Sequence, residues 1–176
     1  TPDDPARAVL DGIRAAVPNA TVRYVQGVPD VRSMETAGFA EAVQLARESD
    51  VAILVLGETQ DMSAEANNRT SLDLPGVQRE LAEAIHATGT PVVVLLMNGR
   101  PLSIPWLDEN VPAILETWYL GSEMGPAVAD VLLASNASPS AMPSNSRMAC
   151  FGPRTGSRMA GAAFIRKRAL IRVLLL

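Results

Sequence analysis

The sequence is short of the residues that most often build metal sites and covalent cross-links. Its 176 residues include one cysteine and one histidine. A single cysteine excludes an internal disulfide framework and a zinc site built from cysteines. A single histidine argues against a metal site with several histidine ligands. The sequence therefore argues against both classes of metal site and against disulfide cross-links within the chain.

Long apolar runs are also missing. No stretch approaches the roughly 18–20 consecutive apolar residues that a membrane-spanning helix needs, so we expect no membrane partner. Hydrophobic residues nevertheless make up 48% of the chain, which argues against disorder over most of its length. A chain of this length fits a single domain with a sizeable core.

Acidic residues are absent from one part of the chain. Residues 1–133 hold all 19 acidic residues and 8 basic residues, a net charge of −11, whereas residues 134–176 hold seven basic residues and no acid. The acidic part argues against a nucleic-acid partner, because phosphate contacts need clustered cations. Residues 135–146 are rich in Ser, Asn, Ala and Pro without a period, so we predict an irregular basic tail over 134–176.

Residues 5–133 alternate between helical and strand patterns. The runs 51–56 and 91–97 are apolar without a break, which indicates strands buried on both faces, as in a parallel sheet covered by helices. The alternating order predicts an α/β fold, a doubly wound, mainly parallel sheet with helices on both faces. Further predicted strands cover 21–26 and 112–117, predicted helices cover 5–17, 39–48, 75–87 and 123–133, and a short turn or helix covers 101–108.

Ligands of such sheets bind beyond the carboxyl ends of the strands. The segments that follow the predicted strands there are 57–70, 98–101 and 118–121, and the first is long for such a loop, where about 2–6 residues are usual. Together they offer carboxylates, amides, arginines and two aromatic rings, which suits a sugar. No glycine-rich phosphate-binding motif is present, which argues against a nucleotide-binding domain.

Several of these residues have a structural interpretation as well as a functional one. Glu58 could pair with an arginine or cap a turn instead of contacting a ligand. Glu65 could be a solvated acid in a loop, and Arg100 could bind a backbone carbonyl. Trp118 could serve packing rather than form a ligand platform. The residues alone leave these alternatives open.

Several motifs occur in order between residues 50 and 132. They are Asp50-Val-Ala-Ile-Leu-Val-Leu-Gly-Glu58, Glu65-Ala-Asn-Asn-Arg-Thr70, Leu74-Pro-Gly-Val-Gln78, Pro91-Val-Val-Val-Leu-Leu-Met-Asn-Gly-Arg-Pro-Leu102, Ala113-Ile-Leu-Glu-Thr-Trp-Tyr119 and the run 123–132. On these residues, the stretch 40–133 resembles the C-terminal α/β sandwich domain of glycoside hydrolase family 3, in particular periplasmic-type bacterial β-glucosidases. Residues 1–39 resemble the helix and strand that precede this core.

The resemblance implies a retaining exo-β-glycosidase that hydrolyses terminal β-linked sugars with two carboxyl groups and no cofactor or metal. It implies that the nucleophile is an Asp on a separate N-terminal (β/α)8 barrel and that Glu65 is the acid/base. A general acid must be protonated at the working pH before it can give its proton to the leaving group. Glu58 and Arg69 would orient the loop or bind the sugar. Asn98, Arg100 and Trp118 would support the site or the domain interface.

The sequence departs from the family in two ways. No barrel precedes residue 1, so we expect the isolated chain to be inactive, and the alternative function is a non-catalytic carbohydrate-binding or interdomain packing module. Residues 134–176 lack the family's usual continuation after the last helix. We interpret them as translated in a shifted reading frame, with a native basic linker as the alternative. The chain shows no signal peptide, although the resemblance favours a periplasmic or secreted protein.

Overall fold

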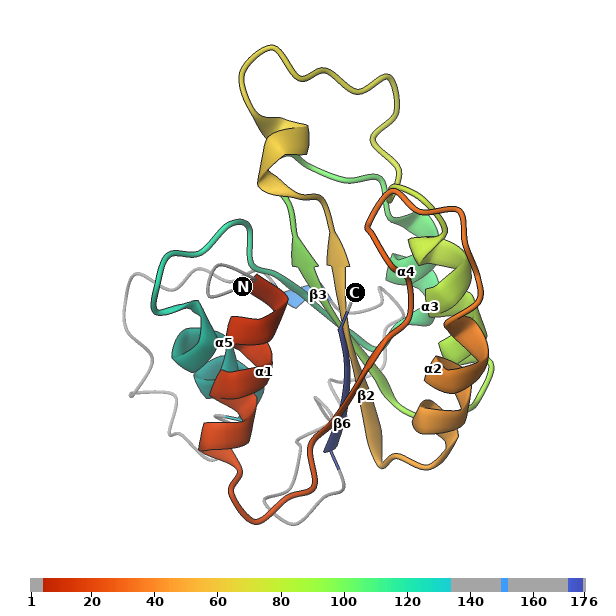
Figure 1. Cartoon of the computed structure of the whole chain (residues 1–176), viewed down its shortest axis with the longest axis vertical. Helices are drawn as coiled ribbons and strands as arrows, with labels where there is room; N and C mark the ends of the chain where they lie inside the picture. Colours follow the sequence, from red (N-terminus) through yellow and green to blue (C-terminus); the bar gives the residue numbers. More distant parts are fainter. Residues whose placement is uncertain (1–4, 134–149, 152–170, 176) are drawn as a thin grey trace.

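The computed structural model describes residues 5–133, 150–151 and 171–175. A six-stranded sheet forms its centre (Figure 1). All neighbouring strands are parallel except the last, which pairs antiparallel at one edge. In spatial order the strands are β1 (Arg23–Gln26), β6 (Ile171–Leu175), β2 (Val51–Gly57), β3 (Val92–Met97), β4 (Ala113–Glu116) and β5 (Cys150–Phe151).

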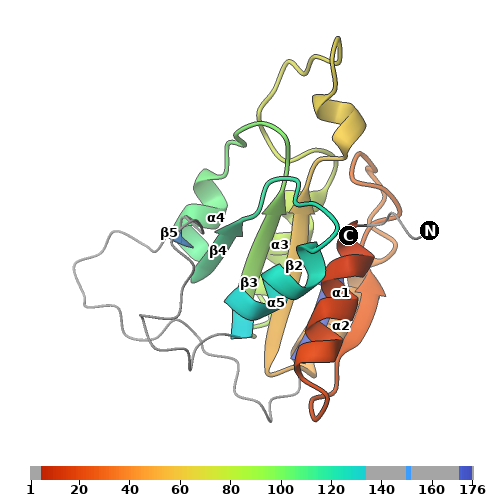
Figure 2. The same cartoon turned by 90° about the vertical axis from the view of Figure 1, so that its left-hand side faces the viewer.

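Helices cover both faces of the sheet, as Figures 1 and 2 show. Helices α1 (Pro5–Ala16) and α5 (Met124–Leu133) pack together on one face. Helices α2 (Phe39–Arg47), α3 (Gln78–His86) and α4 (Pro105–Asn110) lie on the other. Every residue of β2 and β3 is buried, which confirms the predicted doubly wound sheet. None of the helices in the described ranges is long and apolar enough to cross a bilayer.

The alternation of side chains along β2 divides the core into two layers. Val51, Ile53 and Val55 belong to the cluster that contains α1 and α5. Leu54 and Leu56 belong to the cluster that contains α2 and α3. This is the period of two expected of a strand, with both faces apolar because both faces are covered.

The structure corrects the prediction of an irregular tail at two places. Residues Ile171–Leu175 form β6, which pairs with β1 on one side and β2 on the other. Cys150–Phe151 pair with β4. A five-residue, mostly apolar run is ambiguous by itself, and only the space between two other strands makes it a strand. The other residues of the predicted tail lie outside the described residues, so both interpretations of its origin stay predictions.

The register of β2, β3 and β4 brings three loops to one edge of the sheet. Gly57 pairs with Met97, and the next residue, Glu58, donates its N–H to the Met97 carbonyl at 2.8 Å. Thr117 donates its N–H to the Leu96 carbonyl at 2.9 Å. The loops that follow these strands therefore start side by side, as predicted. The loop after β2 extends beyond the sheet (Figure 1) and contains the short helix η1 (Gln60–Ser63).

Candidate functional site

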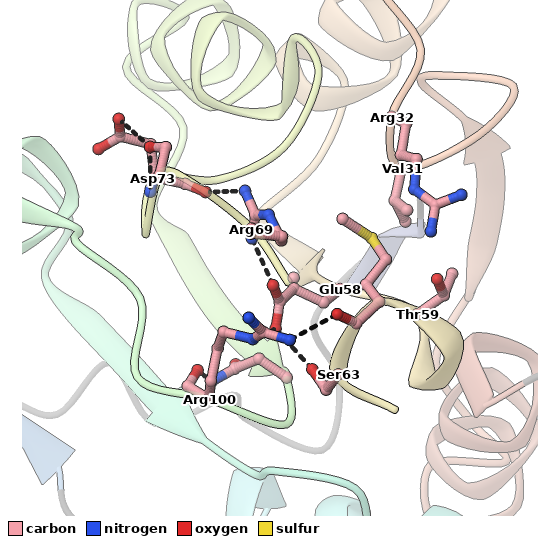
Figure 3. Close-up of polar contacts among 12 residues, drawn as sticks. Val31, Arg32, Glu58, Thr59, Ser63, Arg69, Asp73 and Arg100 are labelled. Atoms are coloured by element: carbon pink, nitrogen blue, oxygen red, sulfur yellow. Dashed lines mark hydrogen bonds and ion pairs between the residues drawn. The ribbon is translucent and has the colours of Figure 1, made fainter. Parts of the chain in front are cut away.

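A buried carboxylate lies where the three loops meet. Glu58 directly follows β2, and its side chain has no exposed surface. Its Oε1 accepts a hydrogen bond from Nη1 of Arg69 in an ion pair, and Ser63 Oγ donates to its Oε2 at 3.0 Å. Nε of Arg100 lies 3.8 Å from the same Oε2 (Figure 3). A buried carboxylate needs such compensation, because an unpaired charge is strongly disfavoured away from water.

The two arginines also bind backbone carbonyls of the loop after β2. Arg69 donates from Nη2 to the Asp73 carbonyl at 2.7 Å. Arg100 donates from Nη2 to the carbonyls of Met62 at 2.5 Å and Asn67 at 3.1 Å. Each guanidinium thus joins Glu58 to a distant point of the loop, which fixes the loop to the end of the strand.

The loop after β4 adds a third attachment. The hydroxyl of Tyr119 lies 2.7 Å from the Thr59 carbonyl and 3.2 Å from that of Glu58. Gly99 lies between Ser63 and the Tyr119 ring, so a Cβ at Gly99 would stand 2.5 Å from the Ser63 Cβ and 2.8 Å from the ring. Burial raises the pKa of Tyr119, so its hydroxyl stays protonated and can donate.

Glu65 is exposed on the outer part of the same loop. It lies in a turn closed by the Asn67 N–H, which donates to the Ala64 carbonyl at 3.1 Å. The next residue, Ala66, has a φ of 64°, a left-handed conformation that non-glycine residues seldom adopt. Glu65 has no ion-pair partner among the described residues. Its carboxyl group is free to meet a ligand or a second domain.

A second carboxylate, Glu116, holds the start of the loop after β4. Its Oε1 accepts the Trp118 N–H at 3.1 Å, and its Oε2 accepts from Nδ2 of the fully buried Asn98 at 3.3 Å. Trp118 has a φ of 53°, and 46% of its surface is exposed. Burial raises the pKa of Glu116, and the hydrogen bonds from Trp118 and Asn98 oppose this effect.

The structure brings some of the predicted site residues together and separates others. Glu58, Arg69 and Arg100 form one cluster, whereas Glu65 lies outside it on the exposed turn. Because the Glu58 carboxylate is buried and paired, its geometry favours orienting the loop over contacting a ligand. Asn98 also donates to the Arg100 carbonyl at 2.9 Å, which suits a supporting role.

Two residues of the site, Glu116 and Ser63, were not predicted from the sequence. The signal for Glu116 was available, since it is a charged residue at the end of an otherwise apolar strand. Nothing in the sequence pairs Ser63 with Glu58. No group of three or more His, Cys, Asp and Glu side chains among the described residues is placed to hold a metal ion. The arrangement that remains is a loop fixed at its base with one exposed carboxyl group at its outer turn.

Comparison with known proteins identifies the family of this domain. The family model for the glycosyl hydrolase family 3 C-terminal domain matches residues 4–145. A β-xylosidase of Formosa agariphila is 48% identical over 126 residues, 71% of this chain and 17% of the relative. A periplasmic β-glucosidase of Salmonella typhimurium is 52% identical over 92 residues, 52% of this chain and 12% of the relative. The chain thus spans less than one fifth of the length of these relatives.

Solved structures show the same fold. A mutant β-glucosidase of Listeria innocua in complex with laminaribiose shares 34% identity over 74% of this chain and 17% of that structure, with a TM-score of 0.65. A family 3 exo-β-xylosidase bound to a xylobiose aziridine probe shares 33% identity over 69% of this chain and 16% of that structure, also with a TM-score of 0.65. Sequence and fold together establish that this chain belongs to glycosyl hydrolase family 3, as a C-terminal domain of that family.

Proposed function

We propose that this chain is part of a retaining exo-β-glycosidase, β-glucosidase-like, in which Glu65 is the acid/base. The observation that carries the proposal is the placement of Glu65, an exposed carboxyl group on a loop whose base is fixed by the buried Glu58 ion pairs. A proton donor must be held within reach of the reacting oxygen while remaining accessible to it. A fixed loop base with an exposed outer turn meets both requirements.

The proposed substrate is a terminal β-linked sugar, and the proposed partner is an N-terminal (β/α)8 barrel that carries the nucleophilic Asp. The small share of each relative that the chain covers supports a multidomain protein. Met34, Leu72 and Trp118 are exposed large apolar residues in loops that follow β1, β2 and β4. A second domain seated on this edge would cover them and would bring its own carboxylate toward Glu65.

The reaction would proceed in two steps. First, the barrel carboxylate attacks the anomeric carbon while Glu65 gives its proton to the leaving glycosidic oxygen. Then the Glu65 carboxylate takes a proton from water, the water oxygen attacks the anomeric carbon, and the bond to the barrel carboxylate breaks. Two carboxyl groups about 5–5.5 Å apart are needed for this retaining course. Glu58 and Arg69 orient the loop, and Asn98, Arg100 and Trp118 support it or contact the barrel.

A chimera tests the role of Glu65. Residues 40–133 of this chain would replace the corresponding residues of the Salmonella typhimurium enzyme, and Glu65→Gln would be compared with the control Glu80→Gln at an exposed helical position. We expect Glu65→Gln to lower kcat/KM on an alkyl β-glucoside about 10²–10⁴-fold. The loss should be much smaller on a dinitrophenyl β-glucoside, whose leaving group needs no proton. Equal activity of both variants on the alkyl glucoside would refute the assignment.

A second candidate function applies to the chain by itself, a non-catalytic carbohydrate-binding or packing module. Glu65 is an exposed carboxyl group in the loop after β2. The second catalytic carboxyl group of the proposed reaction is assigned to the barrel, not to any of the described residues. We therefore expect the purified 176-residue chain to show no turnover of a nitrophenyl β-glucoside above the level of its Glu65→Gln variant. Turnover above that level would mean that the chain carries both carboxyl groups.

A further inference from the structure

The turn that carries Glu65 adopts a backbone conformation that its own residues do not favour. Ala66 follows Glu65 with a φ of 64°, in a position where turns usually place glycine or asparagine. A left-handed alanine costs free energy, so the surrounding contacts must hold it there. Because Ala66 adjoins Glu65 in the same turn, its backbone conformation contributes to the position of the Glu65 side chain relative to the rest of the loop.

Contacts on both sides hold this turn. Asn67 closes it through its N–H to the Ala64 carbonyl, and its Nδ2 donates to the Asp61 carbonyl at 2.6 Å. The Asn67 carbonyl in turn accepts from Nη2 of Arg100, the same nitrogen that binds the Met62 carbonyl. Asn67 therefore uses its amide N–H, its carbonyl and its side chain to fasten the turn. Arg100 connects it to the buried Glu58.

The neighbouring asparagine provides a contrast. Asn68 is exposed, as Asn67 is, but its side chain has no hydrogen-bond partner in the part of the chain that the structure describes. The two residues have the same chemistry and adjacent positions, and they differ in their contacts with the turn. If only the polarity of the loop mattered, replacing either asparagine by alanine would have the same effect. If the hydrogen bonds to the turn matter, only the replacement of Asn67 should have an effect.

We propose that Asn67 is a positioning residue that, with Arg100, holds Ala66 in its left-handed conformation and thereby aims the Glu65 carboxyl group at the leaving oxygen. The chemical part of this inference, the aim of the Glu65 carboxyl group, rests on the proposed function of Glu65 as the acid/base. Its structural part, the fastening of the turn by Asn67, does not depend on that role. The two parts are therefore tested separately.

The structural part is tested on the full 176-residue chain by NMR amide hydrogen exchange at the turn. We expect Asn67→Ala to speed exchange of the residue 67 amide about five- to tenfold, as the loss of roughly one hydrogen bond would. Asn68→Ala should leave this rate unchanged. Equal rates in the two variants would overturn the fastening role, and thermal unfolding of both variants confirms that each is folded.

Ala66 gives an independent check on the same measurement. Ala66→Gly should keep the turn, because glycine adopts a positive φ freely, whereas Ala66→Val should open it, because a β-branched residue there is a steric outlier. Slower exchange in Ala66→Gly than in Ala66→Val supports the proposal. The same exchange rate in both would show that the conformation at Ala66 does not matter to the turn.

The chemical part is tested in the chimera described above by the dependence on leaving group. Asn67→Ala should lower kcat about tenfold or more on the alkyl β-glucoside, with little change on the dinitrophenyl β-glucoside and little change in KM. Asn68→Ala should match the parent on both substrates. In a Glu65→Gln background, Asn67→Ala should have no further effect on kcat, because it acts through Glu65.

The outcomes separate the two proposals. If Glu65→Gln shows no leaving-group dependence, the acid/base assignment fails, whatever Asn67 does. If Glu65→Gln shows it and Asn67→Ala does not, the assignment stands and the positioning role of Asn67 fails. A loss of kcat that is equal on both substrates would likewise overturn that role, since it would indicate a structural defect unrelated to proton donation.

Discussion

The side-chain amide of Gln78 hydrogen-bonds both backbone groups of Gly57. Its Oε1 accepts the Gly57 N–H at 2.8 Å, and its Nε2 donates to the Gly57 carbonyl at 2.8 Å. Gln78 is the first residue of α3 and has no exposed surface. Since Glu58 follows Gly57 directly, this contact joins the start of α3 to the residue on which the loop after β2 is anchored.

We expect Gln78→Leu to destabilise the domain by about 2–5 kcal/mol, because it leaves two buried backbone groups of Gly57 without partners. It also removes the bond from Nε2 to the Val31 carbonyl, which is 3.0 Å long. Urea unfolding followed by circular dichroism measures the loss. Gln44→Leu, at an exposed position of helix α2, is the matched control and should stay within about 0.5 kcal/mol. Similar losses in the two variants would argue against a special role for Gln78.

Gly57 itself should tolerate no side chain. Its φ is 141°, and a Cβ there would lie 2.0 Å from the Met97 carbonyl oxygen, which accepts the Glu58 N–H. We expect Gly57→Ala to cost about 3 kcal/mol or more, from overpacking and backbone strain together. Gly89→Ala is the control, because Gly89 also has a positive φ but nothing lies within 4 Å of its added Cβ. It should cost about 1 kcal/mol, and equal costs would mean that the contact with Met97 relaxes freely.

The Glu58–Arg69 pair should be strongly coupled in a double-mutant cycle. Arg69→Met leaves the buried Glu58 carboxylate with Ser63 and the more distant Arg100, so we expect a loss of about 3–5 kcal/mol. When Arg69→Met is combined with Glu58→Gln, the coupling energy between the two positions should be about 1–3 kcal/mol.

The exposed helical pair Arg79–Glu83, whose Nε and Oε1 are 2.8 Å apart, is the control for this cycle. Its coupling should not exceed about 0.5 kcal/mol, because exposed pairs are screened by water. Chemical denaturation of the four variants of each cycle supplies both energies. Equal coupling in the two cycles would mean that burial adds nothing to the Glu58–Arg69 interaction.

The sheet was predictable because its two central strands are apolar on both faces. The runs 51–56 and 91–97 leave few alternatives to buried parallel strands, and the loops of interest then fall at one edge. Strand β6 was not predictable by the same reasoning. Its five residues form a strand because β1 and β2 leave room for one between them, which is a property of the assembled sheet.

The candidate site was predictable as a location but not as a network. The sequence indicated that Glu58, Arg69 and Arg100 belong to neighbouring loops, and the structure shows that they share one buried ion cluster. The pairing of Arg100 with the carbonyls of Met62 and Asn67 spans more than thirty residues of chain and has no periodic signal. The left-handed conformation of Ala66 could not be predicted from the sequence either, because alanine gives no sequence cue for a positive φ.

Glu116 should make the stability of the domain depend on pH in a defined direction. Burial raises its pKa in the folded state above the ordinary value of 4.5. The folded state therefore favours the protonated form, so the contribution of Glu116 is fully present below 4.5 and declines as the pH rises through the folded pKa. Glu116→Gln removes this titration, and its stability relative to the parent should be higher at pH 7 than at pH 4.

Urea unfolding of the parent and of Glu116→Gln at both pH values measures the effect of this titration. Glu109→Gln at an exposed position is the control, and its stability relative to the parent should not rise in the same way between the two pH values. Glu116 also accepts a hydrogen bond from the backbone N–H of Trp118. The fluorescence of Trp118 in a Trp106→Phe background should therefore change over the same pH interval. A relative stability of Glu116→Gln that is constant or falls between pH 4 and pH 7 would mean that the hydrogen bonds from Asn98 and Trp118 outweigh burial.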